Sequence, residues 1–402
     1  MIRSFGARNF LSIKDRVAIE LEIGSKATDA ENIFIKTPDG KRFPSVIAIY
    51  GANAAGKTSF LSIPRFLADF IANSAFYPPE LSIAVFPFLS KDTTALPSEL
   101  SASFDLPFGN GDVATYWYEL QATQDKVQSE VLRFAAAGSN RKLLFQRTLD
   151  NDRYKFEFGP AFRSPNVDSL APQVGKKASL ISFLSISGHP IALQVRTAAM
   201  LVFSNILAYG RQQFPAEDVA TKIYKDNQAA KRQLLDFIRF LDIGITDMDF
   251  KELDSKDIQG RPNKVAVPTF SHSSLSRPLD FHEESHGTRA LYIRFPSLMG
   301  PLDTGGIAII DEFDSDLHPL VIPKIIDLFH SKDTNKKGAQ LFFSGHNPYT
   351  LSFLEKEEVY FAEKNLNGET SFFGLRDVSG VRRADNYFLK YLSGSYGAVP
   401  RL

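Results

Sequence analysis

The octapeptide GANAAGKT at Gly51–Thr58 has the most specific chemical implication of any segment in this sequence. It matches G-x-x-x-x-G-K-[ST], in which glycines allow backbone N–H groups to fold around phosphates. Lys57 is expected to reach the β- and γ-phosphates, and the Thr58 hydroxyl to ligate Mg²⁺. A structural glycine turn is the alternative, but the loop lies between an apolar run and a helical pattern, which favours nucleotide binding. The predicted contacts are Gly51, Asn53, Ala54, Ala55, Gly56, Lys57, Thr58 and Ser59.

Two adjacent carboxylates follow the apolar run Ile307–Ile310 in the segment GGIAIIDEFDSDLHP. We expect Asp311 at the carboxyl end of a parallel strand, where ligands collect. There it can hold Mg²⁺, largely through water. Glu312 should point to the other side of the strand end, where a carboxylate can polarise an attacking water. Glu312 is therefore the predicted catalytic base.

Three further polar residues follow these carboxylates and allow two interpretations. Asp314 and Asp316 could form a second metal site, but we favour a turn and a cap for a helix that starts near Leu317 and Pro319. His318 could be a metal ligand. Without thiolates or a spaced histidine pair, a helix-start residue is the preferred interpretation.

The segment LFFSGHN places Ser344 and His346 at the end of another apolar run. A lone histidine is usually structural. At a strand end beside a phosphate loop, however, it could sense the γ-phosphate. His346 is therefore the second predicted catalytic residue.

The segment FHEESHGTRAL at residues 281–291 combines two acids with small hydroxyls and a glycine before an apolar helical pattern. Ser285 can be a simple helix cap. The exposed N–H groups and hydroxyl of such a cap are also what a phosphate requires. Both interpretations start a helix at the same place.

The elements that position these residues follow from the hydrophobic pattern. Residues 1–50 and 98–147 alternate as strands do, and Val46–Tyr50, a glycine loop and a helix pattern form a βα unit. Residues 177–245 are helical in period, with Gly244 as a stop, and residues 246–281 return to short strands. The apolar window at 191–210 contains Gln194 and Arg196, so we predict a buried helix rather than a membrane span.

Composition narrows the class of protein. The chain has 402 residues, 46 basic and 46 acidic side chains and no cysteine. Balanced charge does not favour direct nucleic-acid binding or membrane attachment. A local basic patch is still compatible with this balance. The absence of cysteine excludes disulfides and thiolate zinc sites and fits a reducing cytoplasm. A cytoplasmic protein is therefore expected.

In chain order these segments resemble the head of an ABC-type ATPase, of the branch that includes chromosome-maintenance and break-repair ATPases and OLD-type nucleases. NFLSIKD matches the N-terminal strand, Gly51–Thr58 Walker A, ESHGT the signature, Ile307–Glu312 Walker B, DSDLH the D-loop and SGHN the His switch. The tail YLSGSYGAVP resembles the C-terminus of RloA-like abortive-infection ATPases, which are AAA ATPase-like and related to AriA and PtuA. The Q-loop glutamine is assigned to none of its four candidates, Gln121, Gln124, Gln128 and Gln194.

The resemblance implies an α/β P-loop NTPase of ABC-ATPase-head type, with a mixed β-sheet core, an N-terminal antiparallel β-subdomain and a helical insertion. The expected division is an N-terminal ATPase lobe at 1–150, a mainly helical insertion at 151–280 and a C-terminal ATPase lobe at 281–402. The resemblance also implies that ATP and Mg²⁺ bind between two protomers of a homodimer or higher homo-oligomer. Ser285, Gly287 and Thr288 of one protomer would complete the ATP site of the other, while Thr58 and Asp311 hold Mg²⁺.

Three functions are compatible with these features. The first is an ATP-driven scaffold or switch in anti-phage defence that controls a separately encoded nuclease or toxin, as the resemblance implies. The second is a DNA repair or recombination ATPase that clamps DNA directly, for which long coiled-coil arms or a basic surface are expected and are absent from the pattern. The third, a transporter subunit, fits the divergent signature least well. A nuclease within the chain is disfavoured, because only 56 residues follow His346.

Overall fold

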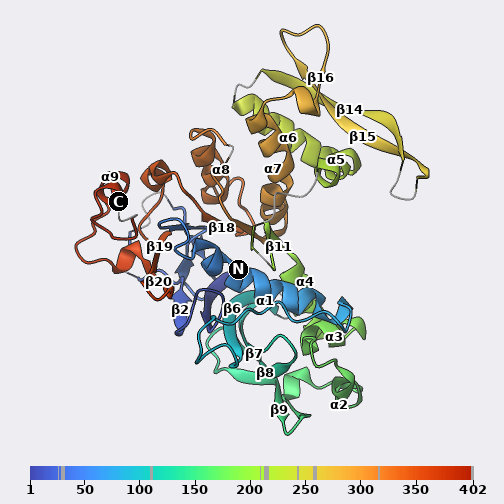
Figure 1. Ribbon diagram of the computed structural model, residues 1–402, viewed down its shortest axis with the longest axis vertical. Helices are drawn as coiled ribbons and strands as arrows, with labels where there is room; N and C mark the ends of the chain where they lie inside the picture. Colours follow the sequence, from blue (N-terminus) through green and yellow to red (C-terminus); the bar gives the residue numbers. More distant parts are fainter. Residues whose placement is uncertain are drawn as a thin grey trace.

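The computed structural model describes residues 1–25, 27–28, 32–108, 112–208, 210–211, 217–241, 244–256, 260–315 and 317–399. Its centre is a six-stranded sheet that carries the phosphate loop (Figure 1). The strands lie in the order β11 (Val202–Ser204), β17 (Ile307–Ile310), β18 (Gln340–Ser344), β5 (Val46–Tyr50), β19 (Val359–Lys364) and β20 (Thr370–Gly374). All neighbours are parallel except the antiparallel pair of β19 and β20.

A seven-stranded antiparallel sheet packs beside this core. Its order is β10 (Arg153–Phe158), β9 (Lys142–Asp150), β8 (Val127–Ala136), β7 (Asp112–Ala122), β6 (Ser98–Phe108), β1 (Ile2–Arg8) and β2 (Val17–Glu20). A short pair, β3 (Ile35–Lys36) and β4 (Arg42–Phe43), follows β2 in the chain. The predicted α/β fold, with a mixed sheet core and an antiparallel N-terminal sheet, is confirmed by these two sheets.

Helix α1 (Lys57–Asn73) lies between the two sheets (Figure 1). Alternate residues of β5 point to opposite faces, as the two-residue period of a strand requires. Ile47 and Ile49 join α1 and the antiparallel sheet in one apolar core. Val46, Ala48 and Tyr50 face a second core that contains the helices of the other side. Because both faces of β5 are buried, its sequence is apolar throughout.

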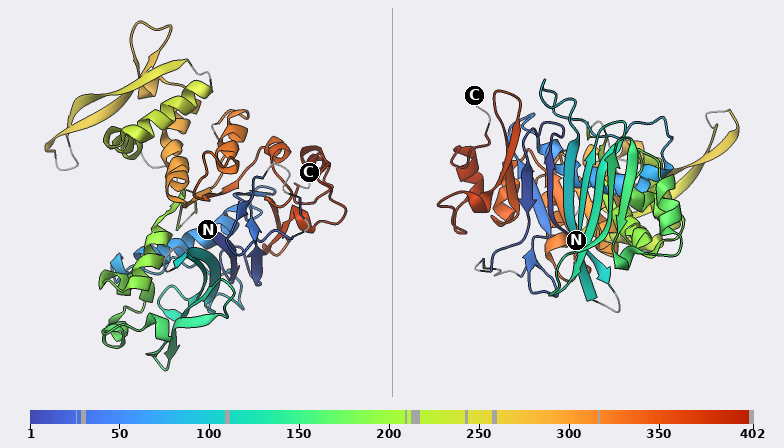
Figure 2. Two further views of the ribbon diagram at one scale, coloured as in Figure 1. Left: turned by 180° about the vertical axis from the view of Figure 1, so that it is seen from behind. Right: turned by 90° about the horizontal axis from the view of Figure 1, so that it is seen from below.

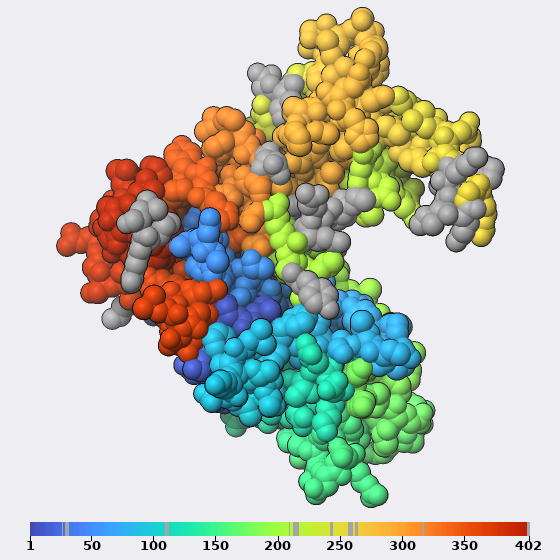
Figure 3. Space-filling view, viewed as in Figure 1, coloured from blue at the N-terminus to red at the C-terminus, as the bar shows by residue number. Residues whose placement is uncertain are grey.

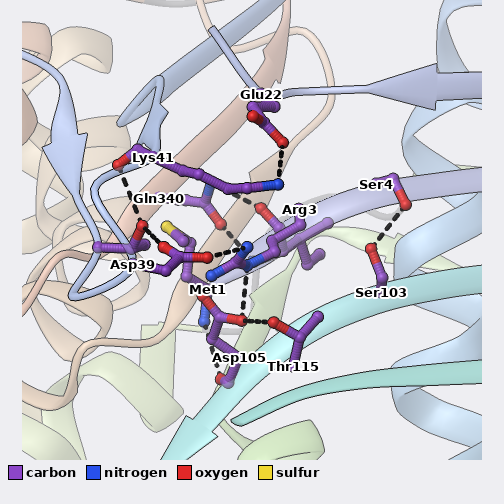
Figure 4. Close-up of polar contacts among 12 residues, drawn as sticks. Met1, Arg3, Ser4, Glu22, Asp39, Lys41, Ser103, Asp105, Thr115 and Gln340 are labelled. Carbon is purple, nitrogen blue, oxygen red and sulfur yellow. Dashed lines mark hydrogen bonds and ion pairs between the residues drawn. The ribbon is translucent and has the colours of Figure 1, made fainter. Parts of the chain in front are cut away.

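A buried glutamine joins the two sheets where β18 and β1 begin (Figure 4). Gln340 begins β18, accepts a 2.7 Å hydrogen bond from the Ile2 amide with Oε1 and donates with Nε2 to the Ile2 carbonyl at 3.2 Å. Nearby, the Arg3 guanidinium contacts Asp105 at 2.6 Å and Asp39 at 3.0 Å. The start of the chain is thereby held against the central sheet.

Residues 151–280 contribute to three parts of the structure. Strand β10 ends the antiparallel sheet, α2 (Val167–Leu170) follows it, and α3 (Leu180–Ile186) and α4 (Pro190–Met200) pack with α1. Strand β11 and the hairpin of β12 (Ile206–Leu207) and β13 (Gly210–Arg211) follow α4. The predicted helix at 191–210 is therefore wrong beyond Met200, because Val202–Ser204 pair with the strand Ile307–Ile310.

The rest of this segment forms a lobe with α7 (His286–Thr304). It contains α5 (Glu217–Asp226), α6 (Gln228–Phe240), β14 (Ile245–Lys256), β15 (Pro262–His272) and β16 (Leu279–Asp280). Strands β14 and β15 have 12 and 11 residues, so the prediction of short strands there is wrong. They form a long ribbon that projects from the molecule (Figure 2). In the space-filling view, a hollow separates this lobe from the part that contains the antiparallel sheet (Figure 3).

Two helices complete the C-terminal part, α8 (Val321–His330) between β17 and β18 and α9 (Tyr387–Leu392) near the end. Tyr391 of α9 stacks on Phe361 of β19 at 5.4 Å between ring centroids. Across the described ranges, none of the helices combines the length and the apolar character that crossing a membrane requires.

Candidate functional site

The phosphate loop connects β5 to α1 through two glycines that no other residue could replace without a clash. Gly51 has φ 152°, and a Cβ on it would lie 2.4 Å from the Ala362 carbonyl oxygen. Gly56 has φ 106°, and a Cβ there would lie 2.5 Å from Thr370 Oγ1. Both positions exclude side chains by backbone conformation and by space. The loop backbone can therefore approach a ligand closely.

The ammonium group of Lys57 lies inside this loop. Its Nζ donates to the carbonyl oxygens of Gly51 at 2.9 Å and Ala52 at 3.1 Å. Burial lowers the pKa of Lys57, and the carboxylates of Asp311 and Asp314 oppose this shift. A bound phosphate would add to the negative charge that favours the protonated ammonium.

Two predicted Mg²⁺ ligands are in direct contact. Thr58 Oγ1 donates a 2.7 Å hydrogen bond to Asp311 Oδ2, and the Ser344 hydroxyl donates to the other carboxylate oxygen. A hydroxyl beside a buried carboxylate is an oxygen donor set of the kind Mg²⁺ prefers. The described residues contain no cluster of three or more His, Asp or Glu suited to a metal ion. Thr58 and Asp311 thus offer one hydroxyl and one carboxylate at this place.

Asn205 holds the backbone of Asp311 in place, and the sequence analysis did not identify it. Its Oδ1 accepts from the Asp311 amide at 2.8 Å, and its Nδ2 donates to the Asp311 carbonyl at 2.9 Å. Asn205 directly follows β11, the edge strand beside β17. In the sequence, Asn205 is marked only as a polar residue that follows a short apolar run. That run lies in the window 191–210, for which we predicted a helix.

Glu312 has a left-handed backbone conformation, with φ 49°. Its amide donates to the Ser344 hydroxyl at 2.8 Å, so its backbone is held by the neighbouring strand. Its carboxylate forms an ion pair with Arg211 through Oε2, and Oε1 lies 3.9 Å from His346 Nε2. Left-handed conformation is unusual for a residue other than glycine and often marks a functional site.

The loop that carries His346 is fixed by Asp314. One carboxylate oxygen of Asp314 accepts from the amides of His346, at 2.7 Å, and Asn347. The predicted helix-capping role of Asp314 is therefore wrong, since α8 begins at Val321 after Leu320. Asp316 lies outside the described residues. His318 Nδ1 accepts from the Leu320 amide at 3.2 Å, so His318 lies just before the start of α8 at Val321, close to the helix-start position that we predicted for it.

Burial and the charges around the cavity act on His346. Its pKa is lowered first by desolvation and then by the positive charge of Lys57, whereas Asp314 and Asp311 act in the opposite direction. The imidazole therefore favours its neutral form more strongly than a histidine in water does.

One cavity, of about 640 Å³, contains most of the predicted site. Its size suits a small ligand, and its lining is largely polar. Ser12 and Lys364 belong to this lining, although the sequence analysis identified neither of them. Ser12 lies 2.8 Å from Ser59, hydroxyl to hydroxyl. The cavity is lined by Ser12, Asn53, Ala54, Ala55, Gly56, Lys57, Thr58, Ser59, Asp311, Glu312, His346 and Lys364.

The predicted signature residues do not line this cavity. Ser285 is the N-cap of α7, and its hydroxyl accepts from the Thr288 amide at 3.1 Å. Helix α7 has 19 residues and is therefore about 28 Å long, and its other end leads to β17. Ser285 is exposed and Gly287 half-buried, whereas Thr288 is buried and lies 2.9 Å from the Ser285 hydroxyl. The first two are accessible from outside the molecule.

None of the four candidate Q-loop glutamines lines the cavity either. Gln121 and Gln128 lie on β7 and β8 of the antiparallel sheet, and Gln124 lies between these strands. Gln194 lies on α4 and donates to the Pro107 carbonyl. Asn205, in contrast, donates with its side-chain amide to the carbonyl of Asp311, at the end of β17.

Comparison with solved structures finds chains of similar extent at low identity. A structure titled as an SMC head bound to the C-winged helix domain of ScpA has 12% identity and a TM-score of 0.49, with 93% of this chain and 97% of that chain covered. The recombination mediator RecF has 12% identity and a TM-score of 0.33 in two nucleotide complexes. The complex titled RecF-ATPrS covers 93% of this chain and 98% of its own. The complex titled RecF-ATP covers 92% of this chain and 97% of its own.

No curated protein matches the sequence. A protein-family model does match it, over residues 46–352. This range includes the phosphate loop, the signature segment, both carboxylates and His346, and it is well over half of the chain. The chain belongs to the AAA-domain family described as "AAA domain, putative AbiEii toxin, Type IV TA system".

Proposed function

We propose that this protein binds ATP with Mg²⁺, hydrolyses it, and acts as a nucleotide-dependent dimerising switch in abortive-infection defence. The observation that carries the proposal is the separation of two sets of residues. The phosphate loop, Asp311, Glu312 and His346 share one cavity. Ser285 and Gly287 lie at the far, accessible end of α7. The first set would be an incomplete phosphoryl-transfer site, and the second is an accessible helix N-terminus, which suits a phosphate.

Within the cavity, each side chain has a role that its position supports. Lys57 would exchange its contacts with loop carbonyls for the phosphates, and Thr58 and Asp311 would hold Mg²⁺. The metal, when bound, neutralises charge on the phosphates. Glu312 would accept a proton from the attacking water, and His346 would contact the γ-phosphate. Most of the rate enhancement would come from such preorganised charges.

Completion of the site would require a second copy of the chain. Ser285 and the amides near Gly287 would contact the γ-phosphate held by the other protomer. Nucleotide binding would thus join two protomers, and hydrolysis would separate them. This exchange is a two-state element of the kind that a switch requires.

The defence role and the effector rest on the family and on the tail. The family description names an abortive-infection toxin and a toxin–antitoxin system, and the sequence resembles RloA-like ATPases in its last residues. We infer a separately encoded nuclease or toxin as the partner. ATP-dependent dimers would hold it until a trigger changes the nucleotide state.

The decisive experiment measures mass in solution with and without Mg²⁺–ATP. The Glu312→Gln variant should bind ATP, lose at least about 100-fold in turnover, and accumulate as a dimer. Lys57→Ala is the matched control and should stay monomeric in ATP. A Glu312→Gln protein with wild-type turnover would contradict the assigned base. A monomeric Glu312→Gln protein saturated with ATP would contradict the switch.

The partner requires a separate test. The product of the adjacent reading frame should co-purify with the Glu312→Gln protein in ATP and less well with Lys57→Ala. Equal recovery with both variants would argue against control by nucleotide.

A further inference from the structure

We infer that Arg211 is a positioning residue for hydrolysis, which holds the Glu312 carboxylate in the orientation that water activation requires. This inference rests on the proposed ATPase function. Arg211 belongs to the short hairpin of β12 and β13, and its guanidinium forms an ion pair with Glu312 Oε2. The other oxygen, Oε1, lies 3.9 Å from His346 Nε2. The carboxylate is therefore flanked by two nitrogen-bearing groups from different parts of the chain.

The backbone of Glu312 is already fixed without Arg211. Its φ of 49° is left-handed, and its amide donates to the Ser344 hydroxyl. The next amide, of Phe313, donates to the Ser344 carbonyl at 2.9 Å. What stays free is rotation about the side-chain bonds of Glu312, which is 38% exposed. An ion pair that limits this rotation reduces the number of unproductive orientations.

The position of Arg211 in the chain supports the same role. Asn205 and Arg211 belong to one segment, which starts with the edge strand β11. Asn205 holds the backbone of Asp311 through two hydrogen bonds, and Arg211 holds the side chain of the next residue, Glu312. Because β11 runs parallel to β17 with Ser204 opposite Ile309, the segment leaves the sheet beside both carboxylates. One short segment thus aligns the metal ligand and the base.

Arg211 acts through Glu312 rather than on the nucleotide. Its side chain is not among those that line the cavity. Arginine suits this task, because its planar guanidinium stays charged and binds a carboxylate in a defined geometry. Loss of Arg211 should therefore reduce the rate of the chemical step and leave nucleotide affinity nearly unchanged.

A double-mutant cycle on the full-length protein tests this role. Single-turnover hydrolysis of radiolabelled ATP would be measured for wild type, Arg211→Ala, Glu312→Gln and the double variant. ATP affinity would be measured with a fluorescent ATP analogue. Arg211→Ala should lower the hydrolysis rate about 10- to 100-fold in wild type. In the Glu312→Gln background it should change the rate by less than about twofold, because the carboxylate it orients is gone.

Arg133→Ala is the matched control, since Arg133 pairs with Glu119 at 3.4 Å on the antiparallel sheet, away from the site. It should retain wild-type hydrolysis. The same fold loss for Arg211→Ala in both backgrounds, or a loss of ATP affinity in place of rate, would overturn the positioning role. If wild type hydrolyses ATP and Arg211→Ala leaves the rate unchanged, the positioning role is overturned and the proposed ATPase function stands. ATP binding without hydrolysis by wild type would overturn the proposed function as well.

Discussion

The hydroxyl of Thr58, at the start of α1, donates a 2.7 Å hydrogen bond to the carboxylate of Asp311, 253 positions later in the chain. The bond joins the phosphate loop, which follows β5, to the end of the acidic strand β17, although β18 lies between these two strands in the sheet. Thr58 and Asp311 are the two residues that the sequence analysis assigns to Mg²⁺. Their contact places a hydroxyl and a carboxylate oxygen where a cation beside nucleotide phosphates could share them.

Asp311→Asn should remove the part of the ATP affinity that depends on Mg²⁺ and leave the rest. The amide keeps the shape but loses the charge, and its NH2 group cannot accept one of the two hydroxyl hydrogen bonds that the carboxylate accepts. Hydrolysis should therefore fall by about 100-fold or more. Mg²⁺ should raise ATP affinity in wild type and have little effect on the variant. Titration with a fluorescent ATP analogue, with and without Mg²⁺, measures this difference. Asp303→Asn, at the exposed end of α7, is the control, and an equal Mg²⁺ effect in Asp311→Asn would exclude this carboxylate as a ligand.

Ser285→Arg should abolish hydrolysis while ATP binding at Lys57 stays intact. An arginine at the N-cap would displace the γ-phosphate that the other protomer holds, and Ser285 does not line the cavity of its own protomer. Lys57→Ala should fail at the opposite step, nucleotide binding. Both variants would be assayed alone for ATP binding and hydrolysis.

Mixing these two inactive variants is the sharper measurement. In the proposed heterodimer, the intact phosphate loop of the Ser285→Arg protomer would face the intact signature of the Lys57→Ala protomer. One of the two sites in each heterodimer would be complete, so the mixture should regain up to about one half of wild-type activity. Activity that stays at the level of the separate variants would argue against a site shared between protomers.

Asn205→Ala should reduce both stability and turnover. The change removes two hydrogen bonds to the Asp311 backbone and leaves buried polar groups without partners, at a cost of about 1–3 kcal/mol. Displacement of Asp311 should also lower the hydrolysis rate. Chemical denaturation and steady-state hydrolysis measure the two effects.

Asn227→Ala provides the control for Asn205→Ala. Asn227 caps α6 through bonds of 3.0 and 3.1 Å to two amides, far along the chain from the acidic strand end. Its loss should cost about 1 kcal/mol of stability with little change in hydrolysis. If both variants lose activity in proportion to stability, Asn205 has no specific part in the site.

The lowered pKa of His346 predicts a dependence of stability on pH. Its value in the unfolded chain is the ordinary 6.5, and burial lowers it in the folded protein. As pH falls below 6.5, the unfolded state binds the proton first, so this contribution to stability is present above 6.5 and is lost below it. Thermal midpoints at pH 7.5 and 5.5 should differ less in His346→Gln than in wild type. The effect should be small, because the side chain is 44% exposed. An identical pH shift in both proteins would contradict it.

Much of the site could be predicted because its residues are contiguous in the chain. The eight residues of the phosphate loop carry their own strand, turn and helix start, and Asp311 and Glu312 directly follow an apolar strand. Local backbone conformation decides where such residues lie, and the sequence pattern specifies that conformation. The cap at Ser285 was predictable for the same reason, although its distance from the cavity was not.

Asn205, Arg211, Ser12 and Lys364 could not be identified in this way. These residues reach the site because of the order of the strands in the sheets. That order depends on pairing between segments that are distant in the chain. The window at 191–210 shows this directly, since hydrogen bonds to Ile307–Ile309 convert its second half from the expected helix into a strand. The long ribbon of β14 and β15 likewise owes its length to cross-strand bonds that extend to Lys256 and Pro262. Local composition determined the phosphate chemistry, and tertiary pairing alone decided which side chains orient it.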